Sequence, residues 1–169
     1  MRIIAGSAGG LALTRPPDDV RPTMDRVRAA IFSSLGDAVP GARVLDLFAG
    51  SGAMGIEALS RGAASAVFVD ANPRSAACVK TNLRRTGLDG SVQTMDAMKF
   101  LELYASEQFD LIFADPPYAK KSDDRDFATE LLRLPALATA LPSGGTFVLE
   151  RLAGAKDPAD CVLSLVRAR

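Results

Sequence analysis

The tetrapeptide Asp115-Pro116-Pro117-Tyr118 is the part of the sequence best suited to chemistry. Asp115 and Pro116 each precede a proline, which keeps them extended, and neither proline carries an N–H group. The turn therefore presents two hydrogen-bond acceptors, the Asp115 carboxylate and the Pro116 carbonyl. Such a pair can hold the two hydrogens of an exocyclic base amine and free its lone pair from the ring. Tyr118 can stack on an unstacked base, as aromatic side chains do in nucleotide recognition.

A second candidate site is the glycine-rich turn that follows the first apolar run after residue 40. Gly50, Gly52 and Gly55 fit the G-x-G-x-x-G pattern of a strand, a tight turn and a helix start. Asp70 ends the next apolar run, at about the spacing of a ribose-binding acid. A nicotinamide enzyme would place these glycines against a pyrophosphate. S-adenosylmethionine (SAM) has no pyrophosphate, and an enzyme that binds it needs an acid for its ammonium group. Asp46, four residues before Gly50, suits that group and so favours SAM over a nicotinamide cofactor.

Asp96 is a third acidic candidate, because it directly follows the apolar run 92–95. At the end of a strand its side chain could reach the adenine amine of SAM. Asp96 also precedes a helical pattern and could cap that helix. The two roles do not exclude each other, and both remain open. Glu150, which ends the fifth apolar run, is interpreted as a strand-terminal surface acid rather than as a pocket residue.

The composition excludes several classes of chemistry. With no histidine, the chain has no Ser–His or Cys–His pair, no imidazole base and no histidine metal ligand. Two cysteines, Cys78 and Cys161, are too few for a zinc site or a disulfide framework, so no metal is expected. The 20 Lys and Arg residues balance 20 Asp and Glu residues, so no field of the whole molecule directs it to nucleic acid or membrane. The chemistry must use carboxylates, backbone groups or a cofactor.

The elements that must position these residues alternate along the chain. Strands are expected at Val44–Phe48, Ala66–Val69, Val92–Met95, Phe109–Ala114, Thr146–Leu149 and Cys161–Val166. Helices are expected at Met24–Leu35, Met54–Arg61, Arg74–Thr86, Ala97–Ala105 and Phe127–Ala140. The alternation predicts an α/β fold whose mostly parallel sheet is covered by helices on both faces. Residues 1–40 are expected to form a short hairpin and helix extension, followed by one domain in 41–169.

Four stretches of the sequence together resemble one group of enzymes. They cover residues 2–6, 21–28, 46–63 and 115–118. The chain resembles the class I SAM-dependent methyltransferases and, more narrowly, the bacterial RsmD family, which methylates a guanine exocyclic amine of 16S ribosomal RNA. The narrower resemblance rests on the Arg-Pro-Thr-x-Asp-Arg-Val-Arg stretch at residues 21–28.

The resemblance implies a Rossmann-like sheet ordered 3-2-1-4-5-7-6, with strands one and four meeting at the topological switch point. The cofactor it implies is SAM, held by Asp46, Gly50, Gly52, Asp70 and Asp96. The catalytic residues it implies are Asp115, Pro116 and Tyr118. Because the family's sheet closes with two further strands and this chain ends at Arg169, we expect the domain to be truncated at its C-terminus.

Local clusters of basic residues are the candidates for binding RNA phosphates. The N-terminal arginines, including Arg26 and Arg28, outnumber the acids near them. The residues expected to bind substrate are Arg15, Arg21, Pro117, Lys120 and Lys121. The basic stretch 74–85 is better explained as a solvated helix face.

The sequence thus predicts methylation of the guanine N2 amine in 16S ribosomal RNA, either free or in the assembling small subunit. An adenine-amine DNA or RNA methyltransferase remains open, because the Pro-Pro motif does not choose the base. An NAD-dependent oxidoreductase and a non-catalytic RNA-binding module are less favoured. No apolar run approaches the ~20 residues that cross a bilayer, so a cytoplasmic monomer without membrane contact is expected.

Overall fold

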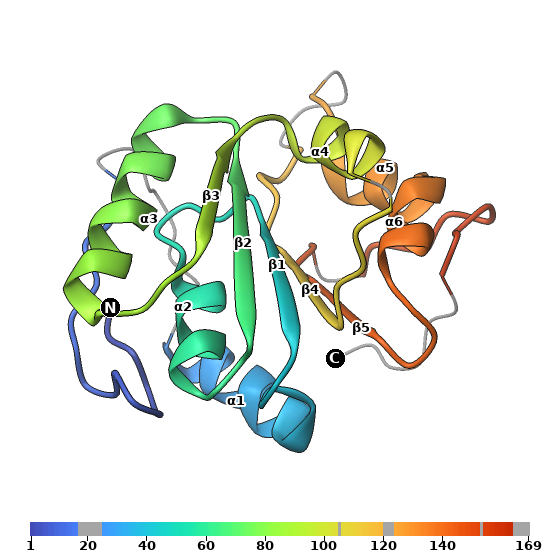
Figure 1. The fold of residues 1–169 in the computed structure, drawn as a ribbon. Coiled ribbons are helices and arrows are strands. Elements are labelled where there is room, and N and C mark those ends of the chain that lie inside the picture. Colours follow the sequence, from blue (N-terminus) through green and yellow to red (C-terminus); the bar gives the residue numbers. More distant parts are fainter. Residues whose placement is uncertain (17–24, 105, 120–123, 153, 164–169) are drawn as a thin grey trace.

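The computed structural model contains one five-stranded parallel sheet with helices on both faces (Figure 1). It describes residues 1–16, 25–104, 106–119, 124–152 and 154–163. The strands are β1 (Arg43–Leu47), β2 (Ser65–Asp70), β3 (Ser91–Thr94), β4 (Leu111–Ala114) and β5 (Thr146–Leu149). Their order is β3-β2-β1-β4-β5, so β1 and β4 are neighbours at the centre. The first five expected strands are confirmed.

The helices follow the strands in alternation. They are α1 (Asp25–Leu35), α2 (Ala53–Ser60), α3 (Pro73–Thr86), α4 (Ala97–Leu103), α5 (Phe127–Arg133) and α6 (Pro135–Ala140), with a short 3-10 turn at Gly36–Ala38. The expected single helix at 127–140 is wrong, because the chain breaks into two helices at Leu134. Pro135 disfavours helical geometry in the residue before it, and Leu134 is extended, with φ −80° and ψ 111°.

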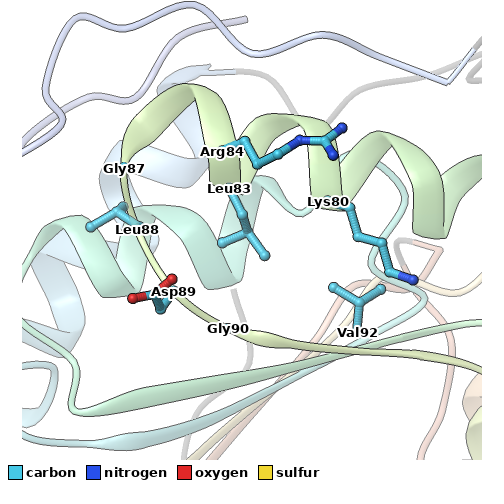
Figure 2. A pocket seen from close by; sticks show the side chains of 8 residues that line it. All are labelled: Lys80, Leu83, Arg84, Gly87, Leu88, Asp89, Gly90 and Val92. Atoms are coloured by element: carbon cyan, nitrogen blue, oxygen red, sulfur yellow. The ribbon is translucent and has the colours of Figure 1, made fainter.

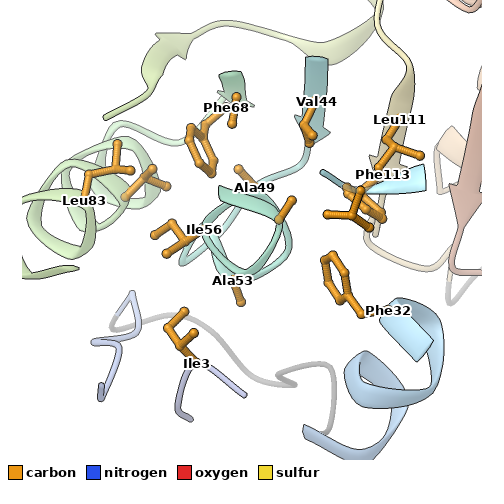
Figure 3. Close-up of a cluster of buried hydrophobic side chains, with 14 of the residues drawn as sticks. Ile3, Phe32, Val44, Ala49, Ala53, Ile56, Phe68, Leu83, Leu111 and Phe113 are labelled. Atoms are coloured by element: carbon orange, nitrogen blue, oxygen red, sulfur yellow. The ribbon is translucent and has the colours of Figure 1, made fainter. Parts of the chain in front are cut away.

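Two hydrophobic clusters cover the two faces of the sheet, because successive strand residues point to opposite sides. Val44 and Leu45 on β1 illustrate the alternation, since each is fully buried in a different cluster. The first cluster packs α1, α2, α3 and the N-terminal segment on one face (Figure 3). The second packs α4, α5 and α6 on the other face. The central strands thus lie between two layers of helices.

The N-terminal segment folds as a short hairpin on α2. Arg2 and Ala12 form an antiparallel bridge, and the Ile3 N–H donates to the Leu11 carbonyl at 2.9 Å. Gly6 has φ +86°, and a Cβ at this position would lie 1.8 Å from the Ser60 carbonyl oxygen. Only glycine therefore allows the hairpin to approach the end of α2 this closely.

The sixth expected strand is wrong for the residues that the structure describes. Cys161, Val162 and Leu163 form no strand, and the Val162 N–H donates to the Leu132 carbonyl at the end of α5. This hydrogen bond and the packing of Leu163 in the second cluster fix the segment against α5 instead of β5. The rest of the expected strand, to Val166, lies outside the described residues. Across the described ranges, no helix is long and apolar enough to cross a membrane.

Candidate active site

The carboxyl end of the sheet brings several acidic residues to one edge. The register aligns four residues at the strand ends in one row, made of Val69, Leu47, Ala114 and Leu149. The residues just beyond this row include Asp70, which ends β2, Asp115 after β4 and Glu150 after β5. The Glu150 N–H donates to the Ala114 carbonyl at 2.9 Å, which extends the register to the edge. In doubly wound sheets, ligands bind at this edge, outside the carboxyl ends of the strands.

The glycine turn between β1 and α2 has the shape expected of a ligand-binding loop. Phe48, Gly50 and Gly52 have φ values of +56°, +54° and +78°, so the chain turns sharply through left-handed geometry. A Cβ on Gly50 would meet only the Phe48 carbonyl oxygen, at 3.9 Å, so the space beside Gly50 is open. The Asp70 carboxylate accepts from the Gly50 N–H at 2.8 Å and from the Asn72 N–H at 2.8 Å. These bonds fix Asp70 beside the turn.

Gly52 and Gly55 allow the turn and α2 to pack closely against neighbouring side chains. A Cβ on Gly52 would lie 3.1 Å from a Val79 methyl group. A Cβ on Gly55 would lie 2.3 Å from the Phe68 ring, so helix α2 can approach β2 only with glycine at this position. The three glycines therefore divide their roles, and Gly50 is the one that faces open space.

Asp46 is the most unusual carboxyl group of the site. It lies on β1, is 4% exposed, and accepts from the Gly55 N–H at 2.9 Å. The pKa of Asp46 is raised to about 8, chiefly by burial; the Gly55 N–H lowers this pKa, and the nearby charges of Asp115 and Asp70 contribute to raising it. A cation placed beside Asp46 would relieve this cost. The buried acid and the open space at Gly50 therefore fit the ammonium-bearing end of SAM.

Asp96 caps α4 and also pairs with a side chain from beyond the fourth strand. One carboxylate oxygen accepts from the Met98 and Lys99 N–H groups at 3.0 and 3.1 Å. The other oxygen binds the Arg125 guanidinium at 3.1 Å. The capping role is thus confirmed, and the expected contact with adenine would have to share this carboxylate with Arg125. Sequence reasoning missed Arg125, which follows a loop and carries no motif.

Arg125 lies over an aromatic pair that joins α5 to the glycine turn. Its guanidinium lies 4.5 Å from the centre of the Phe127 ring. Phe127 contacts Phe48 edge-on, with ring centres 5.4 Å apart. Phe48 is the non-glycine residue with positive φ among those the structure describes. The ring pair links the helix after the Pro-Pro turn to the turn after β1.

The Asp-Pro-Pro-Tyr turn follows β4 directly, beside β1 and β5. Asp115 and Tyr118 are half-buried, Pro116 is buried and Pro117 is exposed. The Tyr118 hydroxyl donates to the Glu150 carboxylate at 2.7 Å. The interpretation of Glu150 as a surface acid is therefore wrong, since it is half-buried and bonded to the turn. Its place at the end of a strand beside β4 was the available signal.

A hollow of about 220 Å³ lies against this turn. Pro116, Pro117 and Tyr118 form one side, and Arg151 and Lys156 add basic groups to its lining. The Arg151 guanidinium binds the Asp157 carboxylate at 2.6 Å. Asp126 also lines the hollow, so its basic groups are accompanied by acids. The aromatic ring beside the two prolines suits stacking on a nucleotide base.

The substrate-binding candidates divide into three groups. Arg15 is exposed at the end of the hairpin, next to Thr14, whose N–H donates to the Asn82 amide oxygen at 2.9 Å. Asn82 is fully buried, and its amide nitrogen donates to the Ser51 carbonyl of the glycine turn at 2.8 Å. Asn82, which sequence reasoning missed, therefore joins the hairpin to the glycine turn. Pro117 lies on the hollow; Arg21, Lys120 and Lys121 lie outside the described residues.

The hypothesis that Arg28 contacts phosphate is wrong, because this side chain is fully buried. Arg28 binds the Arg2 carbonyl, pairs with Asp25 at 3.2 Å and lies 3.7 Å from Glu57. Burial lowers the pKa of Arg28, while the charges of Asp25 and Glu57 raise it. Glu57 also accepts from the Ile4 N–H at 2.7 Å. The second half of the Arg-Pro-Thr stretch therefore holds the hairpin on α2.

A larger hollow, of about 410 Å³, lies away from these acids, where α3 leads into β3. Figure 2 shows Lys80 and Arg84 on α3 above Gly90 and Val92. It contains none of the motif residues and lies near the amino end of β3, opposite the edge where the acids gather. We therefore assign the candidate site to the carboxyl edge.

Comparisons with known proteins show the family of the chain. The family described as "Conserved hypothetical protein 95" matches residues 1–158. YlbH of Bacillus subtilis (strain 168) is 42% identical over 126 residues, which cover 72% of this chain and 68% of YlbH. Ribosomal RNA small subunit methyltransferase D of Escherichia coli (strain K12) is 37% identical over 122 residues, which cover 71% of this chain and 61% of that protein.

Hypothetical protein TTHA0928 of Thermus thermophilus is a solved structure with a TM-score of 0.76 and 38% identity, covering 88% of this chain and 84% of that one. The strand order and the structural neighbours confirm the fold of the class I SAM-dependent methyltransferases. This chain matches about three fifths of the length of the E. coli protein. By its matched length and its motifs, the chain belongs to the conserved hypothetical protein 95 family, that is, the RsmD family.

Proposed function

We propose that this protein transfers a methyl group from SAM to the exocyclic N2 amine of a guanine in small-subunit ribosomal RNA. The observation that carries the proposal is the position of Asp115-Pro116-Pro117-Tyr118 at the end of β4, directly beside the glycine turn of β1. A cofactor at Gly50 and a base amine at Asp115 would then meet in one crevice. The names of the relatives support ribosomal RNA as the substrate.

Five residues would hold the cofactor. Asp46 would take the ammonium group, Gly50 and Gly52 would allow close approach of the chain, and Asp70 would accept from the ribose hydroxyls. Asp96 would reach the adenine from beside Arg125. SAM, when bound, supplies an activated methyl group on a sulfonium leaving group. The buried acid, the open space at Gly50 and the fixed carboxylate of Asp70 support this arrangement.

The residues of the Pro-Pro turn would prepare the amine. The Asp115 carboxylate and the Pro116 carbonyl accept its two hydrogens and draw the nitrogen towards tetrahedral geometry, so that its lone pair becomes available. Asp115 can also accept the proton that the nitrogen releases after the N–C bond forms. Positioning of this kind supplies much of the rate where the leaving group is already activated. Tyr118 and the neighbouring hollow would receive the base after it leaves its stack.

The N-terminal extension, residues 1–40, would contribute to RNA binding as an appendage of the methyltransferase domain, residues 41–169. Arg15, Arg21, Lys120 and Lys121 are the phosphate-binding candidates that remain. We propose that the substrate is 16S ribosomal RNA or the assembling small subunit, and that the protein acts as a cytoplasmic monomer. Gel filtration with light scattering would test the monomer.

The test is transfer of tritiated methyl groups from SAM to ribosomal RNA and to partially assembled small-subunit particles, followed by nucleoside analysis. N2-methylguanosine is the expected product. N6-methyladenosine would favour the alternative, an adenine-amine methyltransferase with the same turn. Binding of NAD but not of SAM in calorimetry would favour an oxidoreductase.

A further inference from the structure

The side chains of Tyr118 and Glu150 form a direct bond across two strands at the candidate site. The Tyr118 hydroxyl donates to the Glu150 carboxylate at 2.7 Å, in a partly buried setting. The backbone of Glu150 is fixed, because its N–H donates to the Ala114 carbonyl and so continues the β4–β5 ladder. The Glu150 carboxylate, at the end of a hydrogen-bonded strand, therefore holds the Tyr118 ring at the Pro-Pro turn.

The turn by itself does not fix the Tyr118 ring. Pro116 and Pro117 restrict the backbone before Tyr118, but the tyrosine side chain still rotates about two bonds. Tyr118 also lines the hollow that the base would enter. A ring that must stack on a base is more effective when its orientation is set beforehand, because less freedom is lost on binding. The bond to Glu150 supplies this constraint.

We propose that Glu150 is a positioning residue, whose carboxylate holds the Tyr118 ring in the orientation that stacks on the extruded base. The role rests on the proposed methyltransferase function and acts through Tyr118. The sequence motifs assign no role to Glu150. Both the carboxylate and a neutral amide oxygen can accept the phenol hydrogen, so the role needs an acceptor rather than a charge.

The first test detects the hydrogen bond between Tyr118 and Glu150 by tyrosine fluorescence, without RNA or cofactor. The chain has two tyrosines and no tryptophan, so Tyr104→Phe leaves Tyr118 as the single strong emitter. A phenol that donates to a carboxylate emits weakly, because its excited state passes the proton to the acceptor. Glu150→Ala in this background should raise the emission, whereas Glu102→Ala, at an exposed acid on α4, should leave it unchanged. Unchanged emission in Glu150→Ala would overturn the proposal.

The second test is a double-mutant cycle on methyl transfer to ribosomal RNA. Glu150→Ala and Tyr118→Phe should each lower kcat by about tenfold, the value of one hydrogen bond to a charged group, with SAM affinity unchanged. The double variant should lose no more than either single variant, because both changes remove the same bond. Glu150→Gln should stay within about threefold of the wild type, since its amide oxygen still accepts.

Two kinetic results would overturn the proposal. Losses that multiply to about a hundredfold in the double variant would mean that Glu150 and Tyr118 act separately. A Glu150→Gln protein as slow as Glu150→Ala would mean that the charge itself is needed. Thermal unfolding of each variant shows whether it is folded. A wild-type protein that methylates no ribosomal RNA would refute the proposed function, and the fluorescence result would still decide whether Glu150 holds Tyr118.

Discussion

Proton release on cofactor binding is the sharpest consequence of the buried Asp46. With a pKa of about 8, Asp46 is almost wholly protonated at about pH 6.5. The ammonium of SAM, an α-amino group, is almost wholly charged at this pH. Placing that ammonium beside the carboxyl would lower the pKa of Asp46 and ionise it. Binding should therefore release about 0.9 proton, and cofactor affinity should rise nearly tenfold per pH unit below about pH 7.

Calorimetry measures this release directly. Titration of S-adenosylhomocysteine, which keeps the same ammonium group, in two buffers with different ionisation enthalpies gives the number of protons from the difference in heat. Asp46→Asn is the matched control, because its amide oxygen can still accept from the Gly55 N–H while nothing is left to ionise. It should bind more weakly and release no proton. A wild-type protein with no proton release and flat affinity between about pH 6 and pH 7 would refute the reasoning.

Asp46 also makes the free energy of unfolding depend on pH. Because the pKa of Asp46 is higher in the folded than in the unfolded protein, the folded protein binds more protons between about pH 4 and pH 8. The contribution of this carboxyl to the free energy of unfolding therefore falls as the pH rises through that window. Denaturant unfolding of the wild type and of Asp46→Asn at several pH values should show this slope in the wild type alone.

Three other predictions concern packing, the hairpin and RNA binding. Gly55→Ala should lower the free energy of unfolding by about 1–3 kcal/mol in urea, because its methyl group would overlap the Phe68 ring; an unchanged midpoint would contradict the packing role. Glu57→Ala should cost about 3–5 kcal/mol in the same assay, since it removes the fully buried carboxylate that faces the buried Arg28 guanidinium and accepts from the Ile4 N–H; a loss below about 1 kcal/mol would contradict this role. Arg15→Glu should weaken ribosomal RNA binding and lower its salt slope by about 1, while Arg84→Glu on α3 should leave both unchanged; equal effects would show a non-specific charge response.

The fold could be predicted because its signals are local. Apolar runs with turn residues between them indicated five strands in the observed places, and the alternation with helices dictated a parallel sheet. The glycine pattern predicted the turn before α2. The break at Leu134 was also readable, since Pro135 stands in the middle of the expected helix. The apolar character of residues 161–163 was misleading, because Leu163 packs in the second cluster without joining the sheet.

The candidate site was predictable where a residue ends or directly follows a strand. Asp115 and Asp70 were found in this way, and their meeting at one edge follows from the strand order. Arg125 and Asn82 could not be found, because their contacts join segments 29 and 68 residues apart and neither belongs to a pattern. Arg28 was misassigned because sequence cannot tell a buried guanidinium from an exposed one. Its burial depends on where the hairpin lies.

The central claim, that the Asp115 turn activates a guanine amine, is tested most directly by methylating ribosomal RNA and small-subunit particles with the wild type and with Asp115→Ala. Both proteins should bind S-adenosylhomocysteine with similar affinity in calorimetry. The wild type should yield N2-methylguanosine at one position of 16S ribosomal RNA, and Asp115→Ala should yield none. An Asp115→Ala protein that forms N2-methylguanosine at the wild-type rate would contradict the account.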